Sequence, residues 1–147
     1  MKIFCGSDHA GFELKNHLMD LLKNERGLEV IDKGTYSKES CDYPDFAQAV
    51  GEAVAADSAA MGLLVCGSGI GISISANKIK GIRAALVSDP YAASLSRLHN
   101  NANIICLGAR LTGPDMAWEC VKAFLDTAFA GGRHEKRVAK ISALENI

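Results

Sequence analysis

The stretch LLVCGSGIG, Leu63 to Gly71, decides the fold of this 147-residue chain. An apolar run of strand length ends at Cys66, and three of the next five residues are glycines. This pattern is typical of a buried strand that turns sharply into a helix. If the helix begins near Ile70, backbone amides and the positive end of the helix dipole face the loop beside a thiol.

The same strand–loop–helix pattern recurs along the rest of the chain. Strands are expected at Lys2–Cys5, Leu28–Ile31, Gly62–Cys66, Arg83–Val87 and Asn103–Leu107. Successive β–α units predict an α/β fold, with a five-stranded parallel sheet covered by helices on both faces. No repeat or linker interrupts the pattern, so residues 1–147 are expected to form a single domain.

Helical periodicity fills the segments between these strands. Apolar residues share one face in 11–25 (Leu14, Leu18, Leu21, Leu22), after Pro44 (Phe46, Val50, Val54) and after Pro90 (Tyr91, Leu95, Leu98). Thr112 is expected to cap a long helix that carries Met116, Cys120, Val121 and Phe124. Gly131 and Gly132 end that helix, and a last helix is predicted at about 134 to 145.

Composition excludes several classes of protein. Hydrophobic residues make up 48% and charged residues 22%, with a formal charge of −1, which is typical of a globular domain. No basic block favours nucleic acid, and no apolar run approaches the roughly 20 residues of a membrane span. The stretch MKIFCGSDHAG does not resemble a signal peptide, so a cytoplasmic protein is expected.

The cysteine pattern favours reduced thiols. There are five cysteines, an odd number, and no C-x-x-C motif. No Cys/His spacing is typical of a metal site either. Cys5, Cys106 and Cys120 are expected to be packing residues.

Polar side chains follow the expected strands. Asp8 and His9 follow the first strand, Tyr43 lies before the second helix, and Cys66 and Ser68 follow the third strand. In open parallel sheets, ligands bind beyond the carboxyl ends of the strands, where the strand order reverses. These residues are therefore candidates for one site.

The glycine loop after Cys66 suits an anion, which could be a phosphate, a carboxylate or a developing oxyanion. It lacks the lysine of a P-loop. Ile72 stands where the last glycine of a dinucleotide fingerprint would be, and also where a cysteine phosphatase needs arginine. A thiol beside such a loop suits proton abstraction next to a carbonyl. A purely structural role, as a small apolar residue at the end of a strand, explains the presence of Cys66 equally well.

Three further sets of polar side chains have two interpretations each. Arg133 and Arg137 are four residues apart, so one helix face could hold a phosphate, or it could simply be a solvated basic face. His99 could act as a general acid or base, or could be a favourable charge at a helix C-terminus. His9 beside Asp8 could be a polar pair of the site or part of a turn.

Five segments in order resemble the type B ribose-5-phosphate isomerase family, which also contains the galactose-6-phosphate isomerase subunits. They are GSDHAG (6–11), DYPDFA (42–47), VCGSGIGISISANK (65–78), HNNAN (99–103) and GGRHEKRV (131–138). The resemblance implies a Rossmann-like three-layer α/β/α sandwich that works as a homodimer, sometimes as a tetramer, without metal or organic cofactor. It also implies interconversion of ribose 5-phosphate and ribulose 5-phosphate through an enediolate.

The resemblance further implies a role for each matching residue. Cys66 is the base, and the amides of Gly67, Ser68, Gly69, Ile70 and Gly71 form the anion hole, with the hydroxyl of Ser68 assisting proton movement between sugar oxygens. His99 opens the sugar ring with Asp8 nearby, while His9, Arg133 and Arg137 hold the phosphate. The site is also lined by Tyr43, Asn100 and Arg110, and His99, Asn100 and Arg110 are implied to come from the neighbouring subunit.

Other functions stay open at this point. Relatives in the cysteine-using branch also act on six-carbon sugar phosphates, such as allose 6-phosphate or galactose 6-phosphate. A non-catalytic sugar-phosphate-binding subunit is a second alternative, although every expected catalytic position is filled. A nucleotide-binding oxidoreductase is a third, and the imperfect glycine spacing argues against it.

Overall fold

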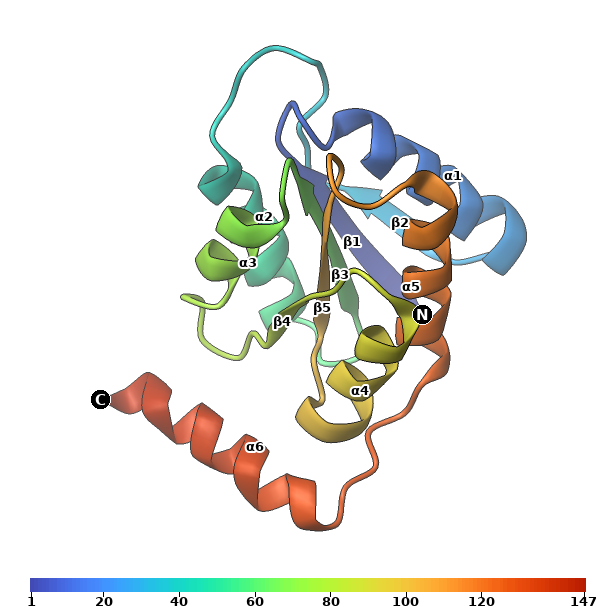
Figure 1. The fold of residues 1–147 in the computed structure, drawn as a ribbon. Coiled ribbons are helices and arrows are strands. Elements are labelled where there is room, and N and C mark those ends of the chain that lie inside the picture. Colours follow the sequence, from blue (N-terminus) through green and yellow to red (C-terminus); the bar gives the residue numbers. More distant parts are fainter.

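A five-stranded parallel sheet forms the centre of the molecule, as the computed structural model of residues 1–147 shows (Figure 1). The strand order is β2-β1-β3-β5-β4. The strands are β1 (Lys2–Ser7), β2 (Glu29–Asp32), β3 (Met61–Cys66), β4 (Ala84–Leu86) and β5 (Ile104–Gly108). The predicted α/β fold with a five-stranded parallel sheet is confirmed.

Helices cover both faces of this sheet and make a three-layer sandwich (Figure 1). One face packs against α1 (Phe12–Arg26), α4 (Pro90–Asn100) and α5 (Pro114–Asp126). The other face packs against α2 (Tyr43–Ala55) and α3 (Ile70–Ala76). Successive side chains of β3 alternate between the two cores, with Leu63 and Val65 on the first face and Leu64 and Cys66 on the second.

The strand order reverses between β1 and β3. The chain leaves β1 toward β2 at one edge of the sheet, and it continues from β3 toward the other edge. β1 and β3 are paired in parallel from Ile3↔Met61 to Ser7↔Val65, so both strands end side by side. A crevice for a ligand is therefore expected just after Ser7 and Cys66.

Two local predictions differ from the structure. Tyr91 is 73% exposed, and α4 buries Ala93, Ser96 and Arg97 instead of the face with Tyr91. Arg97 can be buried because its guanidinium donates to the backbone oxygens of Ala102 and Thr127. Gly113, not Thr112, is the N-cap of α5, and Thr112 is itself buried.

The last helix, α6 (Arg133–Ala143), stands apart from the sandwich and leads into a short 3₁₀ turn, Leu144–Asn146 (Figure 1). None of its residues is buried. It touches the body of the chain near both ends, because the ring of His134 stacks on that of His99 at 4.4 Å and Glu145 accepts a hydrogen bond from the Gly81 amide. None of the helices combines the length and apolar character that crossing a bilayer requires.

Candidate active site

A cavity of about 790 Å³ opens at the point where β1 and β3 end. It is bounded by the end of β1, the segment before α2, the glycine loop after β3 and the turn after β5. Nine of the residues expected in the site line it: Asp8, His9, Tyr43, Cys66, Gly67, Ser68, Ile70, Gly71 and Arg110. The structure thus brings together side chains as far apart in the sequence as Asp8 and Arg110.

Cys66 ends β3 with its thiol toward this cavity. The residue is 4% exposed and is held in place by strand pairing with Gly108. The amide N–H of Gly69 donates a hydrogen bond to Cys66 Sγ at 3.1 Å. The N–H group therefore points at the sulfur, which in its thiolate form is the atom that can take a proton.

The glycine loop has the backbone geometry that this contact requires. Gly69 has a φ of +77°, in the left-handed region that favours glycine, and α3 begins at the next residue as expected. The amide of Ile70 donates to Ser68 Oγ at 3.1 Å, so the hydroxyl proton of Ser68 stays available for donation. Two amides of the expected anion hole therefore contact the two side chains expected to react.

His9 is oriented by the segment that precedes α2. The backbone N–H of Cys41 donates to His9 Nδ1 at 3.2 Å, and the thiol of Cys41 lies 3.9 Å from the same atom. Because Nδ1 accepts, the neutral ring carries its proton on Nε2. His9 is thereby set to donate one hydrogen bond to an anion or hydroxyl in the cavity.

Asp8, Tyr43 and Arg110 complete the wall of the cavity. Asp8 is buried, and its Oδ1 accepts a hydrogen bond from the Gly11 amide at 3.0 Å. A Cβ added at Gly67 would lie 3.1 Å from Arg110 Nη1, so the absence of a side chain lets the guanidinium approach the loop. Arg110 lines the cavity of its own chain, and a contribution of Arg110 to the cavity of a neighbouring subunit stays a prediction.

Four expected site residues lie elsewhere. Helix α4 runs back from the carboxyl end of β4 to the start of β5, so His99 and Asn100 at its C-terminus lie at the amino ends of the strands, whereas Cys66 lies at their carboxyl ends. Arg133 and Arg137 of α6 lie on the same side as His99, because His134 between them stacks on it. Within one chain, these four side chains are not brought to the Cys66 cavity.

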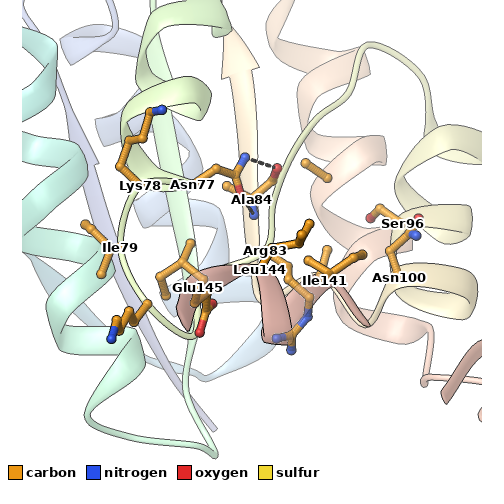
Figure 2. Close-up of a pocket in the computed structure, with 14 residues that line it drawn as sticks. Asn77, Lys78, Ile79, Arg83, Ala84, Ser96, Asn100, Ile141, Leu144 and Glu145 are labelled. Carbon is orange, nitrogen blue, oxygen red and sulfur yellow. Dashed lines mark hydrogen bonds between the residues drawn. The ribbon is translucent and has the colours of Figure 1, made fainter. Parts of the chain in front are cut away.

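Asn100 lines a separate cavity of about 580 Å³ between α4, the segment before β4 and the C-terminal helices. Figure 2 shows Asn100 and Ser96 on one side of it and Ile79 on the other, with Ile141 and Leu144 between them. Seven of its 14 lining residues are hydrophobic, the charged ones are Lys78, Lys80, Arg83 and Glu145, and no thiol lines it. It lacks the reactive groups that surround Cys66.

Sequence reasoning missed Cys41 and Ser40, which also line the Cys66 cavity. Cys41 stands directly before the segment 42–47, and its contact to His9 runs through a backbone amide, which no side-chain pattern reveals. No group of three or more His, Cys, Asp or Glu side chains is placed to hold a metal ion.

The other three thiols, of Cys5, Cys106 and Cys120, lie outside this cavity. Desolvation raises the pKa of Cys5 and of Cys106 far above the ordinary range of a thiol. Desolvation, with a smaller effect of Asp89, raises the pKa of Cys120 to about 11. All three are buried, as expected for packing residues. Only Cys66 and Cys41 face the cavity.

The fold and the thiol-bearing cavity at its switch point define a Rossmann-like α/β enzyme. Residues 3–141 match the family described as Ribose/Galactose Isomerase, and the chain belongs to that family. It is an aldose–ketose isomerase of the type B group.

Similar proteins support this assignment along the whole chain. Ribose-5-phosphate isomerase B of Escherichia coli is 50% identical over 144 residues, which cover 98% of this chain and 96% of that protein. The solved structure of Clostridium thermocellum ribose-5-phosphate isomerase B has a TM-score of 0.96 at 51% identity and covers 99% of this chain and 98% of that one. The Mycoplasma genitalium ribose-5-phosphate isomerase B, solved with bound ribulose-5-phosphate, has a TM-score of 0.94 at 41% identity, with 99% and 96% covered.

Proposed function

We propose that this chain interconverts ribose 5-phosphate and ribulose 5-phosphate, with the thiolate of Cys66 as the base. The observation that carries the proposal is the hydrogen bond from the Gly69 amide to Cys66 Sγ, inside a cavity that also holds Ser68, His9 and Arg110. The E. coli relative is named for this substrate, and the M. genitalium structure holds the ketose product. This reaction would belong to the pentose phosphate pathway in the cytoplasm.

Proton transfer between C1 and C2 follows from the positions of the thiol and the loop. The Cys66 thiolate takes the proton from C2 of the open-chain aldose, and the C–H electron pair forms the C1–C2 double bond of an enediolate. Amides of Gly67 to Gly71 stabilise the charge that develops on oxygen. The hydroxyl of Ser68 assists transfer of a proton from O2 to O1, and the thiol then returns its proton to C1.

The residues near the amino ends of the strands are proposed to serve the cavity of a second subunit. His99, which would open the furanose ring, and Asn100 are too far from their own Cys66 to act there, because Cys66 lies at the carboxyl ends of the strands. A homodimer with shared sites brings them to the partner's cavity, and two dimers could associate further.

Exposed apolar side chains support this dimer. Ile70, Ile74 and Leu111 line the Cys66 cavity and are 50%, 58% and 71% exposed. Ile141 and Leu144 near the C-terminus are 41% and 64% exposed. Burying both groups against a second copy would remove apolar surface from water.

Phosphate recognition would combine His9 and Arg110 with the two arginines of α6. Arg133 and Arg137 are one helical turn apart, both are exposed, and neither forms an ion pair within the chain. Their guanidinium groups are therefore free to hold a phosphate. Because the phosphate is remote from C1 and C2, its binding energy can orient the sugar for proton transfer.

The experiment that tests this function measures isomerisation of ribose 5-phosphate in the presence of EDTA, with the wild type beside Cys66→Ser. We expect turnover by the wild type that collapses in the variant. Allose 6-phosphate and galactose 6-phosphate are assayed in parallel. Turnover of a six-carbon substrate alone would contradict the proposed substrate, and binding of phosphosugars without any turnover would contradict catalysis.

A further inference from the structure

Lys15 of α1 is fully buried, with a side chain that is 0% exposed. Its Nζ donates to Asp32 Oδ1 at 2.7 Å and to the backbone oxygen of Thr35 at 2.6 Å. The rings of Phe12 and Tyr36 face the ammonium group at 5.5 and 5.6 Å. Burying a cation without partners would destabilise the folded state. These contacts stabilise the buried ammonium group and at the same time fix the position of the segment that follows β2.

That segment, residues 32–36, is tied to the end of β1. The Ser7 amide donates to the oxygen of Gly34 at 2.7 Å, and the Thr35 amide donates to the oxygen of Ser7 at 2.8 Å. Asp32 Oδ1, which accepts from Lys15, also accepts from the Gly34 amide at 2.9 Å. One carboxylate oxygen thus joins the lysine to the turn that lies against Ser7.

The same segment continues to Cys41, whose amide contacts His9 Nδ1. His9 is two residues beyond Ser7. The loop 32–41 therefore forms hydrogen bonds both with the last residue of β1 and with the residue two positions after it. Lys15 does not line the Cys66 cavity. The hydrogen bonds of its ammonium group to Asp32 and Thr35 connect its side chain to the site through this loop.

We propose that Lys15 is a positioning residue for His9: by holding Asp32 and Thr35, it sets the loop whose Cys41 amide fixes the imidazole with its proton on Nε2. The kinetic consequence rests on the function proposed above, in which His9 binds the phosphate. The consequence for the His9 ring does not depend on it.

The kinetic test compares Lys15→Met with the wild type on ribose 5-phosphate. We expect KM to rise about tenfold with kcat changed less than about threefold, because a hydrogen bond to a charged group is weakened while the thiol is untouched. In a His9→Asn background, Lys15→Met should change KM by less than about twofold, because both act through the same contact. Equal effects of Lys15→Met in both backgrounds would overturn the proposal.

Lys38→Met is the matched control. Lys38 also links this loop to α1, through an ion pair with Glu13, but both side chains are exposed, at 67% and 76%. We expect Lys38→Met to leave KM unchanged.

If Lys15→Met does not fold, Asp32→Asn replaces it, because the amide keeps an acceptor oxygen but binds Lys15 less strongly. An unchanged KM in folded Asp32→Asn would then overturn the proposal.

Nitrogen-15 NMR of the imidazole rings gives a readout that is independent of activity. At a pH where the rings are neutral, the His9 signals, assigned with His9→Asn, should show a single Nε2–H tautomer in the wild type. Lys15→Met should give a mixture of tautomers, and Lys38→Met should not. A His9 tautomer unchanged in Lys15→Met would refute the positioning role. Absence of wild-type turnover would instead refute the proposed function.

Discussion

The amide of Gly69 and the sulfur of Cys66 are 3.1 Å apart and form a hydrogen bond across the glycine loop. This contact joins the last residue of β3 to the residue before α3. It depends on the left-handed conformation of Gly69, at φ +77°. The conformation of one glycine therefore decides whether the thiol has its donor.

Gly69→Ala should damage both the loop and catalysis. A Cβ there would lie 2.5 Å from Leu86 Cδ1 and 2.8 Å from the backbone carbon of Leu107, in addition to the strain at positive φ. We expect kcat to fall by about 10²-fold or more, the size of the loss when an oxyanion donor is removed. Steady-state kinetics and thermal unfolding measure the two effects.

Gly113→Ala is the control for that substitution. Nothing lies within 4 Å of a Cβ at Gly113, whose φ of −66° suits any residue. Its kcat should match the wild type. An equal loss of kcat in both variants would show that the position of Gly69 beside Cys66 is irrelevant.

Replacing the two thiols of the cavity should lower kcat to different extents. Cys66→Ser should lower kcat by about 10²–10⁴-fold, the range for loss of a general base. Cys41→Ser should lower kcat less than about tenfold, because the Cys41 amide, which the variant keeps, makes the hydrogen bond to His9. The measurement is kcat for both directions of the reaction. Comparable losses in the two variants would refute Cys66 as the single base.

Stability should respond to pH through an exposed ion pair of α1 and α5. Arg26 bonds Asp126 and holds the pKa of that carboxyl below its ordinary value. A depressed carboxyl pKa stabilises the folded state above the unfolded pKa, and this stabilisation is lost as pH falls through the folded pKa. Asp126→Asn should therefore lower the free energy of unfolding by about 0.5 kcal/mol at neutral pH and have no effect in strong acid.

Urea unfolding of Asp126→Asn at neutral and strongly acidic pH measures this difference. Asp20→Asn on α1 is the control, since Asp20 is exposed and forms no ion pair. A destabilisation of Asp126→Asn that stays constant with pH would show that the charge is not responsible.

The fold was predictable because apolar periodicity reports burial directly. Leu63 to Cys66 form a continuous apolar run, as a strand covered on both faces must. The face of α4 was mispredicted because periodicity counts only apolar residues. Arg97 is buried there with its polar atoms bonded to backbone oxygens, and Lys15 is buried in the same way.

The site was predictable only in part. Asp8, His9 and Cys66 follow strands that end side by side, so topology brings them together. Cys41 was missed because its contact runs through the backbone. His99 and Arg133 lie away from the Cys66 cavity of their own chain, which no sequence pattern indicates, because the pattern does not report distances between elements.

Mixing two inactive variants tests the shared site most directly. Cys66→Ala and His99→Asn chains are unfolded together, refolded in equal amounts and assayed on ribose 5-phosphate. If His99 serves the partner's Cys66, each mixed dimer has one intact site, and activity should return to about a quarter of the wild type, since about half of the dimers are mixed. No recovery, with mixed dimers confirmed by native mass spectrometry, would contradict a site built from two chains.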